Sequence, residues 1–482
     1  MNLKTVLTFV FIAVSYTTFA QKCSCEDNFY WLKKNFEEND AGFQYVIDKK
    51  GLTEYQNHNN LFSKKVKKIK DLNECRNVLF DWLLFFRPAH LSLAINPDFA
   101  NKSLSKNTES EKKWEEITLT EDQLKKNLSN ISQPGFEGIW ISDSYTIGVV
   151  KRNNEYIGYI LEAKGRKWKP YQVKFKIKEN GDKTYNAVYY LGDYSAQNFS
   201  EVKLIGNNFL KIGFVSLKRS FPNTPESNPE IANYIEAITT QKPFLKEISN
   251  ETVLLRIPSF EHTEKKAIDS ILEVNKKLIL SKQNLIIDVR NNGGGSDGSF
   301  QEIIPYLYTN PIRTVGTEYL STVQNNKRME EFIADPDWSP EEKKWAINGL
   351  EELNANIGKF VSLGGSTVQE RKSDVVYPNP KNIGIIINEN NASTTEEFLL
   401  VAKQSKKVKL FGTTTEGVLD ISNMHFVDFP CKDLVLGYSL SKSLRIPGMQ
   451  IDQKGIQPDF YIDKSIYDYD WVRFTENILK AN

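Results

Sequence analysis

The pattern of apolar and polar positions changes several times along the chain. From residue 26 to 86, apolar residues recur at three- and four-residue intervals, as in "EDNFYWLKKNFEEND" and "DLNECRNVLFDWLLFF", and this spacing predicts amphipathic helices. Asp71 and Asn73 stand where the second helix would begin and are candidates to cap it. The polar segment 96–132 predicts a linker with one short helix near "TEDQLKKNL".

Short alternating runs fill residues 133–247. Examples are "YTIGVVKR", "EYIGYILEA" and "TYNAVYYLG", which are separated by Asn-Asn, Gly-Asp and Glu-Asn-Gly turns. Alternation with period two and turn residues at short intervals predict an antiparallel β domain. Trp140 lies in one of these runs and is expected in the core of that domain.

Residues 248–482 alternate strand-like with helix-like segments, as in "TVLLRIPSF", "EKKAIDSILEVNKKLIL" and "NLIIDVR". Such alternation predicts an α/β core of mixed sheet and helices. A charged helical insertion near 325–360 either covers a cleft or is a solvated excursion. With 482 residues the chain is too long for one core. We expect a multidomain α/β protein, in which a helical N-terminal segment (21–132) and the β domain precede the core.

The first twenty residues have the features of a secretory signal. Lys4 supplies the positive start, "VLTFVFIAV" the apolar middle, and Ala20 the small residue at the cleavage point. The apolar stretch is shorter than the roughly 20 residues that a membrane anchor needs. No later segment is apolar enough to span a bilayer. We therefore expect an exported protein, periplasmic or secreted, without a stable membrane span.

The overall charge argues against one class of partner. The 62 Lys and Arg residues nearly cancel the 61 Asp and Glu residues. A chain without a basic excess has no field to attract a polyanion, so nucleic acid is not an expected partner. The sequence does not indicate an oligomeric state.

The four cysteines are Cys23, Cys25, Cys75 and Cys431. In an oxidising compartment they predict a disulfide between Cys75 and either Cys23 or Cys25. Zinc is the competing interpretation, but a Cys-x-Cys pair without a nearby histidine lacks the usual ligand spacing. No metal site is therefore expected.

Ser393 occupies an informative position in "NENNASTTEEFLL" (388–400), between the apolar run 383–387 and a helix-like pattern. At such a turn the N–H groups of the helix point outward and favour negative charge. That arrangement suits an activated hydroxyl beside an oxyanion site. The alternative is an ordinary helix cap, with Glu396 completing a capping box. This stretch alone leaves both interpretations open.

A second stretch, "NLIIDVRNNGGGSDG" (284–298), places three glycines after an apolar strand. Ordered glycines lose much conformational entropy, so they are tolerated where a backbone must approach something closely. The stretch matches neither a phosphate-binding loop nor a dinucleotide fingerprint. A tight turn that exposes amide donors and a plain loop remain. Asp288 and Arg290 are expected to form a buried pair that fixes this turn rather than to contact a substrate.

Four motifs together resemble one peptidase family. "DVRNNGGG" resembles the Asp-Leu-Arg-Gly-Asn-x-Gly-Gly signature of the C-terminal processing (tail-specific) serine peptidases, and "NASTTEEF" resembles their nucleophile motif. "GTTTEG" (412–417) is similar to their Gly-x-x-Thr-x-Gly loop, and "DQKGIQPD" (452–459) to their acidic turn. The motifs occur in family order. The resemblance implies a crotonase-like or ClpP-like core, a serine peptidase that needs no cofactor, and a peptide or protein substrate.

The family divides by its catalytic base. One branch uses a lysine that follows the serine, and the matching position here is Val418. The chain therefore resembles the other branch, similar to the tricorn core, which uses a histidine from an N-terminal segment and an acid in the late turn. His90, in "FFRPAHLSL", resembles that histidine, with His425 as the reserve candidate. Asp452 holds the acid position, where that branch usually has glutamate.

The resemblance implies a role for each of these residues. Ser393 is the expected nucleophile, His90 its general base, and Asp452 the acid that orients the imidazole. The backbone N–H groups of Gly294 and Thr394 are the expected oxyanion donors. The family's usual PDZ module is not recognisable, so selection of free C-termini is not implied. A catalytically inactive, peptidase-like protein that binds peptides is the alternative. An α/β-hydrolase esterase is disfavoured because no Gly-x-Ser-x-Gly surrounds the serine.

Overall fold

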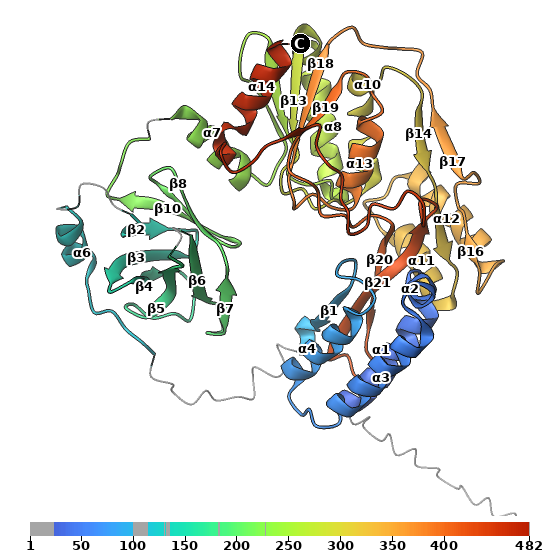
Figure 1. The fold of residues 1–482 in the computed structure, drawn as a ribbon, viewed down its shortest axis with the longest axis horizontal. Coiled ribbons are helices and arrows are strands. Elements are labelled where there is room, and N and C mark those ends of the chain that lie inside the picture. Colours follow the sequence, from blue (N-terminus) through green and yellow to red (C-terminus); the bar gives the residue numbers. More distant parts are fainter. Residues whose placement is uncertain are drawn as a thin grey trace, which may run out of the picture. The chain divides into compact units, whose positions relative to one another are not determined.

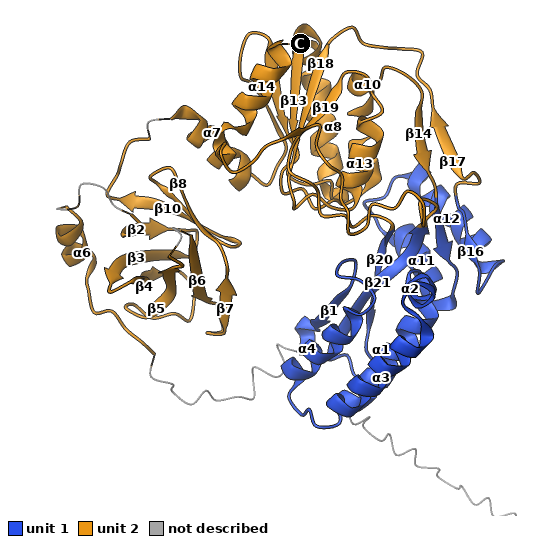
Figure 2. Ribbon diagram, viewed as in Figure 1, with its two compact units in different colours: residues 1–107, 317–363, 421–442 blue, residues 108–316, 364–420, 443–482 orange. Residues whose placement is uncertain are grey.

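The structure is a computed structural model that describes residues 24–99, 114–129, 131, 135–181, 184–226 and 228–481. The predicted signal segment 1–20 and Cys23 lie outside these residues. Figure 1 shows the order of the elements along the chain. The chain forms two compact units (Figure 2): unit 1 contains residues 1–107, 317–363 and 421–442, and unit 2 contains the rest.

Unit 1 begins with the predicted helices. They are α1 (Cys25–Asn39), α2 (Phe43–Lys50), α3 (Leu52–Val66) and α4 (Leu72–Leu83). Asp71 caps α4, because its side chain accepts a hydrogen bond from the N–H of Glu74 at 2.9 Å. Asn73, the other candidate cap, lies inside the helix.

A disulfide between Cys25 and Cys75 joins α1 to α4. It is one of the two pairings that the sequence predicted for Cys75. Phe29 and Phe36 of α1 pack edge-on against Trp82 of α4, and all three side chains are almost completely buried. The cross-link and the aromatic contacts hold the same pair of helices together.

The helices of unit 1 pack on a sheet that the sequence did not assign to them. Its order is β1-β21-β15-β16, with β20 beside β21. The strands come from three distant parts of the chain: β1 (Ser92–Ile95), β15 (Thr317–Leu320), β16 (Phe360–Val361), β20 (Ile421–Asp428) and β21 (Leu434–Ser443). Leu434 and Leu436 of β21 share one apolar core with Phe36 and Trp82. The N-terminal segment is therefore part of a larger, discontinuous unit.

The helical insertion predicted near 325–360 forms α11 (Val323–Ala334) and α12 (Pro340–Asn354). Asn325 donates from its side chain to the Asn39 carbonyl at 2.9 Å and accepts from the Tyr438 hydroxyl at 2.9 Å. Asn325 is 4% exposed. The interpretation of this insertion as a solvated excursion is therefore wrong, since these contacts make it an integral part of unit 1.

Unit 2 contains the predicted antiparallel β domain. Within the described residues it is a nine-stranded sheet in the order β7-β6-β5-β4-β3-β2-β10-β9-β8. Trp140 is completely buried there, as predicted. The strands are β2 (Gly138–Ile141), β3 (Tyr145–Arg152), β4 (Glu155–Ala163), β5 (Val173–Glu179), β6 (Tyr185–Tyr190), β7 (Ala196–Phe199), β8 (Val202–Ile205), β9 (Phe209–Ile212) and β10 (Val215–Phe221), preceded by the predicted short helix α6 (Glu121–Leu128).

Lys174 is a buried cation in this β domain. It is 1% exposed, and its ammonium nitrogen lies 4.0 Å from the ring centroid of Trp168, 4.6 Å from that of Tyr145 and 4.9 Å from that of Tyr189. Burial lowers the pKa of Lys174 to about 7, because the rings solvate a charged amine less well than water does.

Replacing Lys174 by methionine is therefore expected to stabilise the protein at pH 7. Unfolded lysine has a pKa near 10.5, so between about pH 7 and 10.5 the unfolded chain binds more protons than the folded chain. The cost of burying the amine is fully present below pH 7 and is lost as the pH rises toward 10.5. Urea unfolding, followed by tryptophan fluorescence, should have a higher midpoint in Lys174→Met. The corresponding gain in the free energy of unfolding should be about 1 kcal/mol or more at pH 7 and less at pH 10.

Lys178→Met, on the exposed end of the same strand, is the matched control and should leave the midpoint nearly unchanged. A lower midpoint for Lys174→Met at pH 7 would show that the aromatic rings contribute more than burial costs.

The second part of unit 2 is the predicted α/β core. Its sheet has the order β11-β12-β13-β18-β19-β22, in which β12 to β22 pair in parallel and β11 is antiparallel to β12. β11 lies in the range that the sequence assigned to the β domain, but its pairing makes it part of the core. The strands are β11 (Phe244–Glu247), β12 (Thr252–Arg256), β13 (Asn284–Asp288), β18 (Asn382–Ile387), β19 (Val408–Gly412) and β22 (Phe460–Tyr461).

Helices cover both faces of this sheet (Figure 1). Successive strand residues point to opposite faces, so Leu285 and Ile287 of β13 pack with α8 (Lys265–Val274) and α13 (Thr394–Ala402). Ile286, between them, packs with α14 (Trp471–Ala481). Burial on both faces explains why these strands are continuous apolar runs.

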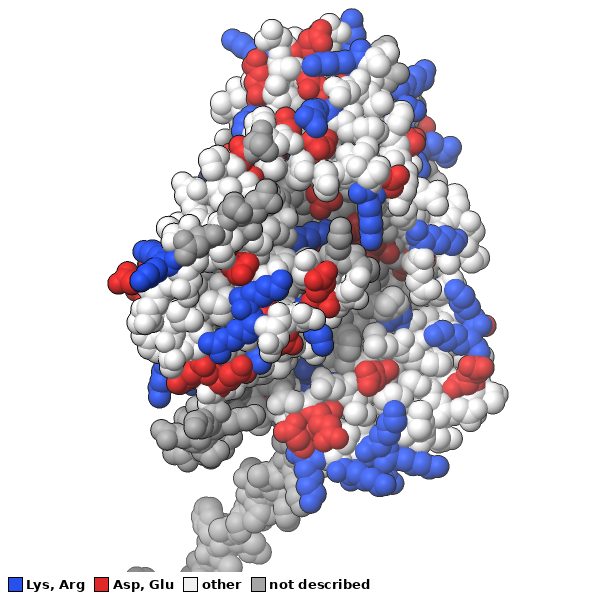
Figure 3. Space-filling model, turned by 60° about the vertical axis from the view of Figure 1, so that its left-hand side comes forward, with Lys and Arg blue, Asp and Glu red and all other residues white. Residues whose placement is uncertain are grey.

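The remaining elements complete the two parts of unit 2. They are α7 (Pro229–Thr239), α9 (Lys276–Ser281), α10 (Ile304–Leu307), β14 (Ile312–Val315) and β17 (Val368–Arg371). None of the helices in the described ranges combines the length and the apolar character that crossing a membrane requires. On the face drawn in Figure 3, basic and acidic side chains are interspersed, so no extended patch of one sign is visible there.

Candidate functional site

Ser393 follows β18 and immediately precedes α13. Its backbone has φ 54° and ψ −123°, a conformation that costs free energy for any residue except glycine. The side chain makes no capping hydrogen bond to the helix. Glu396 accepts instead from the Thr415 hydroxyl at 2.5 Å and from the N–H groups of Gly417 and Val418 at 2.8 Å. The capping-box interpretation is therefore wrong, and the serine hydroxyl is not used by its own helix.

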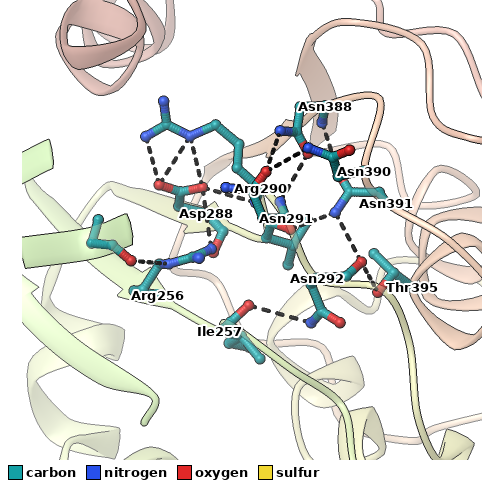
Figure 4. A network of polar contacts seen from close by, with 12 residues as sticks. Arg256, Ile257, Asp288, Arg290, Asn291, Asn292, Asn388, Asn390, Asn391 and Thr395 are labelled. Atoms are coloured by element: carbon teal, nitrogen blue, oxygen red, sulfur yellow. Dashed lines mark hydrogen bonds and ion pairs between the residues drawn. The ribbon is translucent and has the colours of Figure 1, made fainter. Parts of the chain in front are cut away.

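Asparagine side chains fix the turn that carries this serine (Figure 4). Asn391 accepts from the N–H of Asn388 at 2.7 Å and donates to the carbonyl of Asn292 at 3.1 Å. The Thr395 hydroxyl donates to the same carbonyl at 3.0 Å. Asn391 and Asn292 are completely buried. The turn before α13 and the glycine turn after β13 are thus locked to each other, as expected where parallel neighbours end at one edge of a sheet.

Asp288 and Arg290 form the predicted buried pair. Arg290 donates to the Asp288 carboxylate from Nε at 3.0 Å and from Nη2 at 2.7 Å, and its N–H donates to the same carboxylate at 3.0 Å. Although burial opposes ionisation, Arg290 and Arg256 hold the pKa of Asp288 below its usual value. The pair fixes the start of the glycine turn, as Figure 4 shows.

Gly294 lies directly against the serine. A Cβ atom there would be 2.8 Å from the carbonyl oxygen of Ala392 and 2.9 Å from both Ser393 Cβ and the Thr394 nitrogen. Its φ of 107° is also unfavourable for other residues. Gly293, one residue earlier, would have open space around a Cβ. The close approach inferred from the glycines therefore occurs at Gly294.

The two expected oxyanion donors differ in their present partners. Thr394 is the first residue of α13, whose N–H has no acceptor within the helix, and none of the hydrogen bonds among the described residues uses it. The N–H of Gly294 donates to Asn292 Oδ1 at 3.0 Å. Thr394 thus presents a free donor beside Ser393, whereas Gly294 would have to share or exchange its acceptor.

Asp452 lies in unit 2 and is held by reciprocal hydrogen bonds. Its Oδ1 accepts from the N–H groups of Leu419 at 2.7 Å and Asp420 at 2.6 Å. Asp420 Oδ2 in turn accepts from the N–H of Asp452 at 2.9 Å. The carboxylate position is therefore set by the backbone of the preceding loop.

His90 lies in unit 1, in a left-handed conformation with φ 51°. Its Nδ1 is 2.7 Å from the carbonyl oxygen of Ile421, whereas the resemblance implied that Asp452 is the group that orients the imidazole. Because a carbonyl can only accept, we assign the proton of the neutral imidazole to Nδ1, which leaves Nε2 as a proton acceptor. Burial lowers the pKa of His90, with a further contribution from Arg87. The neutral form, which a general base needs, therefore predominates at neutral pH.

His425 is buried in β20 of unit 1, at 2% exposure. Its Nδ1 is 3.8 Å from the Glu331 carboxylate, and its ring packs edge-on against Tyr438. This environment suits a structural histidine. Among the described residues no group of three or more His, Cys, Asp and Glu side chains could hold a metal ion.

The structure thus brings Ser393, Gly294 and Thr394 together in unit 2, which also contains Asp452, while His90 belongs to unit 1. An ion pair between Glu397 and Arg445, at 3.1 Å, was not predicted from the sequence. One signal was present: Glu397 follows the serine by one helical turn, so both residues lie on one side of the helix.

Comparisons with known proteins identify a family and a similar fold. Residues 251–462 match the family model described as peptidase family S41. The fold is similar to that of mature CPAF complexed with lactacystin, at 12% identity and a TM-score of 0.51, with 95% of this chain and 98% of that chain covered. Weaker similarities are to the photosystem II D1 C-terminal processing protease (12% identity, TM-score 0.40, 95% and 98% covered) and to tricorn protease (14%, 0.39, 95% and 36%). None of the curated protein sequences matches the chain significantly.

Proposed function

Since this chain is a serine-type peptidase whose residues 251–462 belong to peptidase family S41, we propose that it cleaves peptide bonds through an acyl-enzyme formed on Ser393. The observation that carries the proposal is the turn around this serine. Its hydroxyl is left out of helix capping in a strained backbone conformation, and it stands beside a free amide donor and a glycine that admits close approach. Such strain is typical of functional sites.

The first step is attack on the peptide carbonyl. His90 Nε2 accepts the proton of the Ser393 hydroxyl as Oγ bonds to the carbonyl carbon, and the electron pair of the C=O bond moves to its oxygen. The Thr394 N–H donates a hydrogen bond to that oxyanion. The Gly294 N–H donates a second one after it has released Asn292 Oδ1. One such donor contributes roughly 3 kcal/mol in comparable sites.

The second step releases the amine. The oxyanion re-forms the C=O bond, the C–N bond breaks, and the imidazolium of His90 gives its proton to the leaving nitrogen, so that an ester remains on Ser393. A water molecule then attacks the ester carbonyl while His90 takes its proton; the ester C–O bond breaks, and His90 returns the proton to Ser393 Oγ. The Ile421 carbonyl holds the tautomer of His90. Asp452 supplies the negative charge that stabilises the imidazolium. Val418, at the position of the other branch's lysine, supports this histidine-based assignment.

The place of action proposed is outside the cytoplasm, periplasmic or secreted. The apolar segment within residues 1–20 supports export. The disulfide between Cys25 and Cys75 supports an oxidising compartment. The substrate is a peptide or protein.

The test is labelling of residues 21–482 with a fluorophosphonate probe, followed by peptide mapping. The proposal predicts one adduct, on Ser393, and none in Ser393→Ala. Labelling that persists in Ser393→Ala would contradict the site. A folded protein without any adduct would favour the alternative, a peptidase-like protein that binds peptides without cutting them. The hydrogen bond from the Gly294 N–H to Asn292, which occupies one oxyanion donor, also favours that alternative.

Gly294→Ala is expected to slow this labelling about 100-fold, because a misplacement of the order of 1 Å at the reacting atoms has roughly that effect. The added methyl group would press on the backbone at Ser393. The second-order rate constant for labelling measures the effect. Gly293→Ala is the matched control, since its methyl group would meet nothing within 4 Å, and it should label nearly as fast as the wild type. Equal slowing in both variants would indicate a general loss of the turn.

A further inference from the structure

A line of buried charged groups leads from the helix of Ser393 to the loop of Asp452. Glu397 lies one helical turn after the serine, and its Oε2 accepts from Arg445 Nη1 at 3.1 Å. Arg445 Nε donates to Asp420 Oδ1 at 2.9 Å. Glu397 is 9% exposed, Arg445 5% and Asp420 completely buried. In such surroundings an ion pair is screened little by solvent.

Asp420 connects Arg445 to Asp452 through hydrogen bonds. Its second oxygen accepts from the N–H groups of Ile451 at 2.5 Å and Asp452 at 2.9 Å. Asp452 accepts in return from the N–H groups of Leu419 and Asp420. Each carboxylate therefore holds the other residue's backbone, so a shift of Asp420 has to move Asp452 as well.

We propose that Arg445 is a positioning residue of the peptidase: by bridging Glu397 and Asp420, it fixes Asp452 relative to the helix that begins after Ser393. This inference rests on the function proposed above, in which Asp452 stabilises the imidazolium. Arg445 acts through that carboxylate and does not itself touch the reacting atoms.

The shape of the guanidinium explains why an arginine occupies this position. Its Nε and Nη1 donors point in different directions within one rigid plane, so it reaches a carboxylate on α13 and another on the loop at once. A lysine ammonium is a single point charge on a flexible stem, and it cannot reproduce this geometry. Glu397 and Asp420 raise the pKa of Arg445 against the effect of its burial, so the bridge keeps its positive charge.

Glu397 gives the bridge a pH dependence. Burial is the largest cause that raises the pKa of Glu397 to about 7; Asp297 and Asp420 add to the rise, and Arg445 opposes it. Above pH 7 the carboxylate is charged and the bridge is complete. Below pH 7 the carboxyl group is protonated and its hold on Arg445 weakens.

A second connection links α13 to the loop that contains Asp452, so Arg445 can be replaced without unfolding the site. Glu396 holds Gly417 independently of Arg445, and the carbonyl of Gly417 accepts from the N–H of Gln453 at 2.8 Å. Variants of Arg445 should therefore retain the loop but lose the placement of the carboxylate.

The experiment is a double-mutant cycle on the rate constant of fluorophosphonate labelling at pH 8. Arg445→Met and Asp452→Asn should each slow labelling about 100-fold, the effect of a misplaced catalytic group, and Arg445→Lys about 10-fold. The double variant Arg445→Met/Asp452→Asn should be no slower than the slower single variant, because both changes remove one function. The inference would be overturned if the double variant were slowed by the product of the two single effects, or if Arg445→Met were labelled as fast as the wild type.

Two controls separate positioning from general stability. Arg219→Met removes another buried arginine, which donates to backbone carbonyls in the β domain, and it should lower the unfolding midpoint without slowing labelling. If Arg445→Met does not fold, Glu397→Gln carries the test, since it should remove the inflection near pH 7 from the pH profile of labelling. A profile unchanged in Glu397→Gln would overturn the inference.

Failure of the proposed function has a different signature. In that case the wild-type protein itself would not be labelled on Ser393. If the wild type is labelled on Ser393, but Arg445→Met has no effect or its effect multiplies with that of Asp452→Asn, only the positioning role is refuted.

Discussion

Replacing Ser393 by alanine is expected to lower the rate of peptide hydrolysis roughly a million-fold, the size of effect found when a catalytic serine is removed from a related type of site. Without the hydroxyl no acyl-enzyme can form, and His90 and Asp452 have no nucleophile to activate. The rate is measured as the appearance of new peptide termini, by mass spectrometry, in a mixture of synthetic peptides incubated with residues 21–482.

Ser405→Ala is the matched control for this variant. Ser405 is a buried serine just beyond the other end of α13, and its N–H bonds to the carbonyl of Ala402. Its replacement should leave hydrolysis within a few-fold of the wild type. Residual hydrolysis by Ser393→Ala at more than about one per cent of the wild-type rate would mean that another nucleophile is used, since a serine knockout retains far less.

Replacing His90 by alanine is expected to have an effect of similar size, because serine and histidine act as a unit. An isolated serine hydroxyl is a weak nucleophile at neutral pH. Ser393 should therefore remain in place and yet react slowly with both peptides and fluorophosphonates. Hydrolysis and labelling rates measured in parallel on the purified variant test this expectation.

The pH profile of the wild type adds a second readout for His90. A general base works in its neutral form, and burial lowers the pKa of His90 from 6.5. The base itself should therefore stay competent as the pH falls to 6.5 and fail only below it, so a loss of activity near pH 7 is expected from Glu397 and not from His90. His425→Ala, which removes the reserve candidate, should leave both the rate and the profile unchanged. If His425→Ala abolished activity and His90→Ala did not, the assignment of the base would be reversed.

The sequence predicted those parts of the fold that depend on local pattern. Helices α1 to α4 follow from apolar spacing, and the cap at Asp71 from its position before that pattern. The strands of the β domain follow from alternation with period two, and the parallel strands of the core from continuous apolar runs. Each of these signals lies within a single element.

The sequence did not predict how distant segments join. The sheet of unit 1 takes strands from around residues 92, 317, 360, 421 and 434, and the pattern of any one of them does not identify its neighbours. The insertion that contains α11 had a charged surface but also buried asparagines such as Asn325, whose partners Asn39 and Tyr438 are far away in sequence. Tertiary contacts, and not local polarity, therefore determine whether this insertion is buried or exposed.

The candidate site shows the same division. The position of Ser393 at the turn before α13 and the closeness of Gly294 were predictable, since a motif and a run of glycines mark them. The partner of Glu396 was not, because a capping box and a hydrogen bond to Thr415 require the same residue types. The bridge from Glu397 through Arg445 depends on side chains about fifty positions apart, and no local rule connects them.

The proposed mechanism requires a serine, a histidine and a carboxylate to act on one peptide bond. A crystal structure of the fluorophosphonate adduct would show their positions, because the phosphonyl group resembles the tetrahedral intermediate. We expect phosphorus on Ser393 Oγ, the His90 Nε2 within about 3 Å of that oxygen, and a phosphonyl oxygen on the Thr394 N–H. An adduct with the His90 ring turned away and no other base beside Ser393 would contradict the proposed mechanism.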